Sequence, residues 1–307
     1  LNVYAFWVAD FEEGVRLRKL GITKPIIIAN PSPRSTNQII KYKLDIVIYN
    51  FRLLEAFGKL NRKIKIHIKF NSGMNRFGFN ENDIKELKLR IDNYSYLKIE
   101  SICSHLSSSK NKNNDQITLN QFERFEKIIV SFKTLFSIKP LIHILNTNGV
   151  LRFKKYQYNT VRIGIGLFGI HEDKKLTQID TLSSSISQIR ILRKGDHVGY
   201  DTSFICKKKM KIGIIPFGYA DGLDRQLGYN NGSLSVKGVL CNIIGDISMD
   251  SCAIDITGSD AKEGDRVEIF GSNNNINIMC KKTNSIPYEF LSKINRRIKR
   301  IYTTSST

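Results

Sequence analysis

The chain has 307 residues, enough for two domains, and 41% of them are hydrophobic, which allows sizeable cores. No apolar run reaches the roughly 18–20 residues of a membrane helix, and the opening "LNVYAFWVAD" is typical of a strand rather than a secretory signal. The net charge of +20 is scattered among Ile, Lys and Asn, whereas a nucleic-acid footprint is localised. We therefore expect neither a membrane nor a nucleic-acid partner.

Strand-like runs alternate with amphipathic segments along the first half of the chain. The runs occupy residues 1–8, 25–29, 45–50, 64–70, 97–106, 139–146 and 160–169. Helices are predicted over "FEEGVRLRKLG", which ends on Gly21, and over "NDQITLNQFERFEKIIVSFKTL". This alternation predicts parallel βαβ units. Seven strands are one short of a (β/α)8 barrel, and the chain opens inside a strand. We therefore predict a TIM-type barrel missing its first βα unit, over residues 1–175.

The pattern changes in the second half. Short β-rich runs follow one another as "LSSSISQIRIL", "HVGYDTSF", "KIGIIPFGY", "GSLSVKGVLCNIIGDISMDSCAIDIT" and "RVEIFG". Turns such as Lys194-Gly195-Asp196 separate them, and a single late helix is predicted near "IPYEFLSKINRR". Residues 176–307 are thus predicted to form a mostly-β C-terminal domain.

The five cysteines form no CxxC pair and are odd in number. They are Cys103, Cys206, Cys241, Cys252 and Cys280. Such a set predicts reduced core residues of a cytoplasmic protein, and we expect no metal site.

Polar residues fall at the predicted strand ends, where parallel barrels place their reacting groups. They are Lys69, Arg76, His105, His143, Thr147 and Arg162. Singly, each has a structural explanation: a lone histidine is usually a satisfied core group, and Gly164-Ile165-Gly166 is weak evidence for phosphate binding. A lysine in a strand is different, because a buried ammonium is costly unless it is paired or chemically altered. Together the set suits an anionic, phosphate-bearing aromatic ligand.

Several blocks resemble alanine racemase in order and spacing, over essentially the whole chain. They are "HIKFNSGMNRFGF", "CSHLSSS", "HILNTNG", "VRIGIGLFGI", "VGYDTSF", "IPFGYADG" and "GDISMD". "IIIANP" and "HILN" are similar to Bacteroidetes-type versions, some of which are fused to a cell-wall ligase. The resemblance implies a barrel plus a β domain that interconverts L- and D-alanine, with pyridoxal 5'-phosphate (PLP) bound as an imine of the amino acid. The product D-alanine would supply peptidoglycan.

The resemblance also implies catalytic roles. Tyr200 is the base on one face of the substrate and acts in the partner subunit's site of a homodimer, with His105 as its own partner. Arg162 faces the pyridine nitrogen. Arg76 holds the substrate carboxylate and pairs with Lys69, which is often carbamylated in the family, while an unmodified Lys69 near a carboxylate is the alternative.

Further residues match binding positions of the family. Met249 gives a backbone contact to the substrate. The phosphate cradle comprises Thr147, Gly164, Ile165 and Tyr219, and Arg162 and His105 also face the cofactor.

Two departures from the family stand out. The lysine that bonds to PLP, and is the base on the other face, lies in the family within an Ala-x-x-Lys-x-x-Ala-Tyr-Gly motif, and residues 1–307 contain no such motif. The chain by itself is therefore expected to be inactive. Asn295 stands where many relatives have a tyrosine, which affects the expected substrate selectivity.

Other interpretations stay open at this point. A single-barrel PLP-binding protein of the homeostasis type would lack a β domain, so Tyr200, Tyr219 and Met249 argue against it. An inactive truncated remnant is a second alternative, and the racemase part of a bifunctional cell-wall ligase and racemase is a third.

Overall fold

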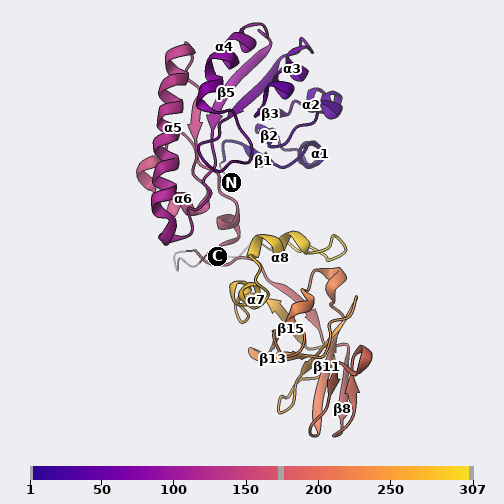
Figure 1. Ribbon diagram of the computed structural model, residues 1–307. Coiled ribbons are helices and arrows are strands. Elements are labelled where there is room, and N and C mark those ends of the chain that lie inside the picture. Colours follow the sequence, from indigo (N-terminus) through magenta and orange to yellow (C-terminus); the bar gives the residue numbers. More distant parts are fainter. Residues whose placement is uncertain (1–2, 172–175, 304–307) are drawn as a thin grey trace. The chain divides into compact units, whose positions relative to one another are not determined.

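The computed structural model describes residues 3–171 and 176–303. The chain divides into two compact units, Leu1–Gly164 (unit 1) and Ile165–Thr307 (unit 2), each with its own hydrophobic core (Figure 1). The predicted domain boundary at residue 175 falls on residues 172–175, outside the described residues. Within the described ranges, no helix combines the length and hydropathy that a bilayer crossing requires.

Unit 1 is built on six parallel strands in the spatial order β1 to β6. They are β1 (Phe6–Val8), β2 (Ile26–Ile28), β3 (Asp45–Ile48), β4 (Ile64–Lys69), β5 (Leu97–Cys103) and β6 (Leu141–His143). The helices are α1 (Phe11–Lys19), α2 (Thr36–Lys41), α3 (Phe51–Gly58), α4 (Ile84–Asp92), α5 (Asp115–Leu135) and α6 (Thr147–Arg152). The predicted βα alternation is confirmed. The strands form an open barrel-type sheet with β1 and β6 at its edges.

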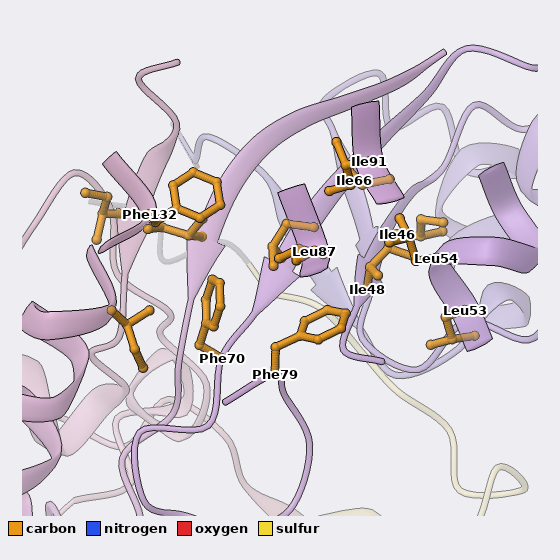
Figure 2. Close-up of a cluster of buried hydrophobic side chains, with 14 of the residues drawn as sticks. Ile46, Ile48, Leu53, Leu54, Ile66, Phe70, Phe79, Leu87, Ile91 and Phe132 are labelled. Atoms are coloured by element: carbon orange, nitrogen blue, oxygen red, sulfur yellow. The ribbon is translucent and has the colours of Figure 1, made fainter. Parts of the chain in front are cut away.

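The main core of unit 1 lies between the outer face of the sheet and the helices. Alternate strand residues such as Ile46, Ile48 and Ile66 point to this side, because successive strand side chains face opposite ways. Figure 2 shows them beside Leu54 of α3 and Leu87 of α4. Each such fully buried side chain stabilises the fold by about 1.5–3 kcal/mol.

Asparagines end two of the strand runs earlier than the sequence patterns predicted. Asn50 Oδ1 accepts from Leu53 N at 2.9 Å and caps α3, and Asn146 Oδ1 accepts from Gly149 N at 2.9 Å and caps α6. The predicted runs 45–50 and 139–146 therefore include helix caps.

The seventh predicted strand, residues 160–169, is wrong. Asn159 N donates to Ile142 O and Arg162 N to Leu145 O, so the segment follows β6 only through isolated bonds. A 3-10 turn, Ile165–Phe168, comes next. No described strand lies on its other side, so a continuous ladder, which makes a strand, does not form.

Unit 2 is an antiparallel seven-stranded sheet in the order β7-β15-β12-β13-β14-β11-β8, with a separate β9–β10 pair. Its strands are β7 (Leu182–Ser185), β8 (Gln188–Leu192), β9 (His197–Val198), β10 (Phe204–Ile205), β11 (Met210–Ile215), β12 (Ser233–Val236), β13 (Val239–Ile244), β14 (Cys252–Asp255) and β15 (Arg266–Phe270). The predicted mostly-β domain is confirmed. Gly195, in a predicted turn, has φ of 97°, which favours glycine.

Two helices follow the sheet of unit 2. The predicted late helix is confirmed as α8 (Pro287–Lys293), but α7 (Ile276–Lys282) was missed. Asn275 caps α7 by accepting from Asn277 N at 2.8 Å, and this residue was the available signal in an Asn-rich stretch typical of a loop.

Candidate active site

The loop after β4 closes back on the strand that precedes it. Phe79 N donates to Lys69 O at 2.9 Å, and Asn71 N donates to Phe79 O at 2.8 Å. Gly78 has φ of 130°, and a Cβ there would lie 2.5 Å from the carbonyl carbon of Phe70, so only glycine fits. The "NSGMNRFGF" stretch is thus a fixed loop with Arg76 on it.

Three strand ends form one row at the carboxyl edge of the sheet. Lys69 of β4 is the register partner of Cys103 of β5, and Cys103 is the partner of His143 of β6. Side chains close this edge, which is where parallel barrels hold their active sites, and leave only a small depression. It is lined by Lys69, Phe70, Asn71, Met74, Arg76, Phe77, Ser104 and His105.

Arg162 makes several hydrogen bonds at this edge. Its guanidinium donates to His143 Nδ1, to His105 Nδ1 at 3.0 Å, and to the backbone oxygens of Ser104 at 2.7 Å and Ile144 at 3.3 Å. Burial lowers the pKa of Arg162, yet a guanidinium stays charged at neutral pH. Because it can only donate, both histidines must accept through Nδ1.

The two histidines are therefore neutral. Burial, followed by the charge of Arg162, lowers the pKa of His105 to about 3, and burial also holds the pKa of His143 well below its usual value. With Nδ1 used as an acceptor, each ring carries its proton on Nε2. His105 can thus donate from Nε2 but cannot serve as a cationic acid at neutral pH.

Three cations lie close together at this edge. Burial first, and then Arg76 and Arg162, lower the pKa of Lys69. Within the described part of the chain, no carboxylate pairs with Lys69, Arg76 or Arg162. We call these three residues the cation cluster. Three neighbouring cations without a described carboxylate have the charge that suits an anionic ligand.

Thr147 and Gly164 meet beside the cluster. Thr147 is buried at the start of α6, and its Oγ1 accepts from Gly164 N at 3.2 Å. Ile165, the next residue, opens unit 2.

In unit 2, Tyr219 and Met249 lie on two loops that are bonded to each other. Tyr219 N donates to Ser248 O at 3.1 Å and Ala220 N to Met249 O at 2.9 Å. The side chains of Tyr219 and Met249 are 43% and 55% exposed. The two loops therefore present both side chains to the outside of unit 2.

Arg297 and Asn295 tie these loops to the C-terminal segment. Arg297 Nε donates to Asp221 Oδ1 at 2.7 Å, and its Nη2 donates to Asp250 Oδ1. Asn295 Nδ2 donates to Ala220 O at 3.0 Å, so the residue that departs from the family pattern holds the backbone next to Tyr219.

Tyr200 follows β9 in a tight turn and is 72% exposed. Gly199 before it and Asp201 after it have φ of 82° and 47°, and left-handed backbone at a non-glycine residue signals local strain. Ser203 Oγ secures the turn by donating to Val198 O and accepting from Asp246 N.

Unit 1 thus brings together Lys69, Arg76, His105, Arg162, and the pair Thr147 and Gly164. The predicted residues Ile165, Tyr200, Tyr219 and Met249 belong to unit 2. Sequence reasoning missed Asp45 and Ser101, which are buried on the inner face of the sheet. Polar residues inside Ile-rich strands were the signal that could have found them.

A parallel βα sheet with three cations at its carboxyl edge, followed by an antiparallel domain, is the arrangement of a two-domain barrel-type enzyme. The family model "Alanine racemase, N-terminal domain" matches residues 1–172, and "Alanine racemase, C-terminal domain" matches residues 179–302. The chain belongs to the alanine racemase family.

Relatives and solved structures agree. Alanine racemase 1 of Caldanaerobacter subterraneus subsp. tengcongensis is 34% identical, over 97% of this chain and 80% of the relative. Alanine racemase of Aquifex aeolicus is 32% identical, over 98% and 84%. The crystal structure of alanine racemase from Bartonella henselae with covalently bound pyridoxal phosphate is 26% identical, with a TM-score of 0.86 over 98% of this chain and 86% of that chain.

Proposed function

We propose that the protein is a PLP-dependent alanine racemase in the cytoplasm, and that the cation cluster of unit 1 holds the anionic groups of its ligands. The single observation that supports this best is Arg162, a buried cation that donates to two neutral histidines and pairs with no described carboxylate. When bound, PLP would make the α proton of the amino acid removable. Five buried, unpaired cysteines are consistent with a reducing compartment.

The residues present fit the anionic parts of this cofactor and of its substrate. Thr147 and Gly164, with Ile165 and Tyr219, would hold the phosphate, and Arg162 would lie at the pyridine nitrogen. Because Arg162 is always protonated, it cannot accept a proton and would leave that nitrogen unprotonated. Lys69 and Arg76 would orient the substrate carboxylate, and Met249 would contact it through its backbone.

Lys69 is proposed to be carbamylated. The neutral amine is the form that reacts with CO2, and the lowered pKa of Lys69 increases its fraction. The product is an anion beside Arg76 and Arg162, which removes the like-charge repulsion within the cluster.

A labelled-bicarbonate experiment tests this modification. We expect a 13C carbamate signal that grows as pH rises, disappears in Lys69→Arg and stays in Lys98→Arg. Lys98 is the matched control because Glu100 raises its pKa. A signal that survives in Lys69→Arg refutes the assignment.

Tyr200 is proposed as the proton-transfer residue on one face of the substrate, acting in the site of a second copy in a homodimer. Its exposed ring is available for such a contact. The neutral His105 donates from Nε2 and would stabilise an ionised tyrosine. The second face needs a lysine that residues 1–307 do not provide in the family motif, so we propose that this polypeptide alone racemises alanine poorly or not at all.

The test compares residues 1–307 with a version extended by a family N-terminal segment that carries the PLP lysine. D-alanine formation and absorbance of the bound cofactor are measured on both. We expect activity only in the extended form, and general-base loss alone is worth about 10²–10⁴-fold. Strong racemisation by the short form would show that another lysine substitutes.

Complementation in the extended form tests the shared site. Tyr200→Phe and Arg162→Lys are each expected to be inactive, whereas mixed dimers of the two should regain part of the activity. Tyr229→Phe serves as the matched control for an exposed tyrosine. A mixture that stays inactive would contradict a site built from two copies.

A further inference from the structure

Four buried polar residues form a line across the inner face of the unit 1 sheet. They are Asp45 on β3, His67 on β4, Ser101 on β5 and His143 on β6, and we call them the interior chain. His67 and Ser101 are register partners in neighbouring strands. The sequence resemblance assigns a role to none of the four.

The interior chain ends on Arg162, and this fixes the direction of its hydrogen bonds. The guanidinium donates to His143 Nδ1, so the proton of that ring is on Nε2. His143 Nε2 lies 3.2 Å from Ser101 Oγ, which therefore accepts there. The hydroxyl proton is then free to point to His67 Nδ1, 2.6 Å away.

At the other end of the interior chain, the position of the proton on His67 follows in the same way. With Nδ1 accepting from Ser101, its own proton is on Nε2, a buried atom with no hydrogen-bond partner. The carboxylate of Asp45 lies 3.7 Å from that atom. A negative charge at this position favours the proton on Nε2, so Asp45 and Arg162 impose the same direction from opposite ends.

A reversed chain would be incompatible with Arg162. If His67 donated from Nδ1, Ser101 would have to donate to His143 Nε2, and the proton of His143 would move to Nδ1. That proton would face an N–H of Arg162, two donors in contact. Reversing the direction of the hydrogen bonds would therefore break the bond between Arg162 and His143 Nδ1.

Trp7 shields this arrangement. Its ring packs edge-on against His143 at 5.7 Å and His67 at 6.4 Å, and the Arg162 guanidinium lies 5.3 Å from the ring centre. Burial strengthens each oriented hydrogen bond because the local dielectric is low.

We propose that Asp45, His67 and Ser101 are positioning residues for Arg162. With His143 they form a one-way hydrogen-bond chain that keeps the Nδ1 of His143 open to the guanidinium and so fixes its orientation. The value of this orientation for catalysis rests on the proposed function, whereas the chain itself can be measured without cofactor or substrate.

The test is 15N NMR on the histidine- and arginine-labelled 307-residue chain, with each ring assigned by a His→Gln variant. In the unaltered protein, His67, His105 and His143 should all show the neutral Nε2–H form. Any other form of His67 or His143 overturns the proposal, whether or not the variants fold.

The variants test the coupling. Ser101→Ala should release the tautomer of His67 and speed proton exchange of the Arg162 guanidinium about tenfold, the equivalent of one hydrogen bond. Ser101→Thr keeps the hydroxyl and should restore both signals. The control is Ser72→Ala, a fully buried serine bonded to Ser104 and outside the chain. Equal Arg162 exchange in Ser101→Ala and Ser72→Ala overturns the proposal.

These readouts separate two failures. Loss of racemisation in the extended protein with the predicted tautomers intact would count against the proposed function only. The wrong tautomers in an active enzyme would count against the interior chain only.

Discussion

The cations at the predicted site residues of the two units have opposite surroundings. At the carboxyl edge of the unit 1 sheet, Lys69, Arg76 and Arg162 lie together with no described carboxylate among them. In unit 2, Arg297 pairs with Asp221 and Asp250 on the loops of Tyr219 and Met249, and Arg225 pairs with Asp246 elsewhere.

The difference distinguishes cations that suit a ligand from cations that hold the protein's own loops. Repulsion between like charges in a partly buried place destabilises the folded protein, and binding of an anion relieves that repulsion. Ion pairs on an exposed surface contribute little stability, but they can hold two loops in register. Arg297 fixes the backbone beside Tyr219 and Met249. The cation cluster of unit 1 has no such partner and would be neutralised by a bound anion.

The largest effect is expected at Arg162. Arg162→Leu leaves two buried imidazoles and two backbone oxygens without a donor and should lower the free energy of unfolding of unit 1 by about 3 kcal/mol. Trp7 is the only tryptophan and lies in unit 1, so its fluorescence during urea unfolding reports this unit alone. The exposed Arg34→Leu is the control, within about 0.5 kcal/mol of the parent. Equal losses in both variants would contradict a structural role for Arg162.

The next effect is acid sensitivity caused by His105. Its pKa is about 3 in the folded state and about 6.5 in the unfolded state, so the unfolded chain binds more protons between these values. Stability is therefore full above pH 6.5 and is lost as pH falls toward 3. His105→Asn should remove about 2 kcal/mol of the loss between pH 7 and pH 4, measured by Trp7 fluorescence in urea. If His105→Asn loses as much unfolding free energy between pH 7 and pH 4 as the parent, protonation of His105 does not destabilise the folded state.

A smaller change of opposite sign is expected at Lys69. In CO2-free buffer at pH 7, Lys69→Met removes a desolvated charge next to two arginines and should stabilise unit 1 by about 1 kcal/mol, after a discount for partial exposure to water. The folded pKa is below the unfolded value, so the unmodified lysine costs stability at low pH. The gain should shrink as pH rises toward about 10.4. Destabilisation by Lys69→Met without CO2 would show a hidden anionic partner.

The smallest effect is local and falls on unit 2. Arg297→Gln should speed hydrogen exchange at the Tyr219 and Ala220 amides, which bond the Met249 loop, and leave the Trp7 transition of unit 1 unchanged. Arg225→Gln is the matched control, because its pair with Asp246 lies elsewhere on unit 2. Equal exchange at the two amides in both variants would show that Arg297 does not hold the loops.

Much of this architecture was predictable from local signals. Period-2 apolar runs predicted β1 to β6, because strand alternation depends on neighbours in the sequence. The run at 160–169 failed for a non-local reason: it looks like a strand, but only isolated bonds to β6 form.

The sequence singled out these site residues one by one but not the network of hydrogen bonds among them. His105, His143 and Arg162 are far apart in sequence, and only the fold shows that one guanidinium donates to both rings. Asp45 and Ser101 gave no motif at all, since a polar residue in a strand has meaning only when the facing strand is known.

By itself the sequence determined the two kinds of domain, the order of the elements of unit 1 and the family, because periodicity, turn residues and short motifs are written along the chain. Tertiary structure alone decided the protonation states and the charge balance. The tautomers of His67 and His143 depend on which donor faces each nitrogen, and the pKa of Lys69 depends on burial and on two arginines brought from elsewhere in the chain. These properties follow from distance and burial in space, and separation along a sequence does not specify either.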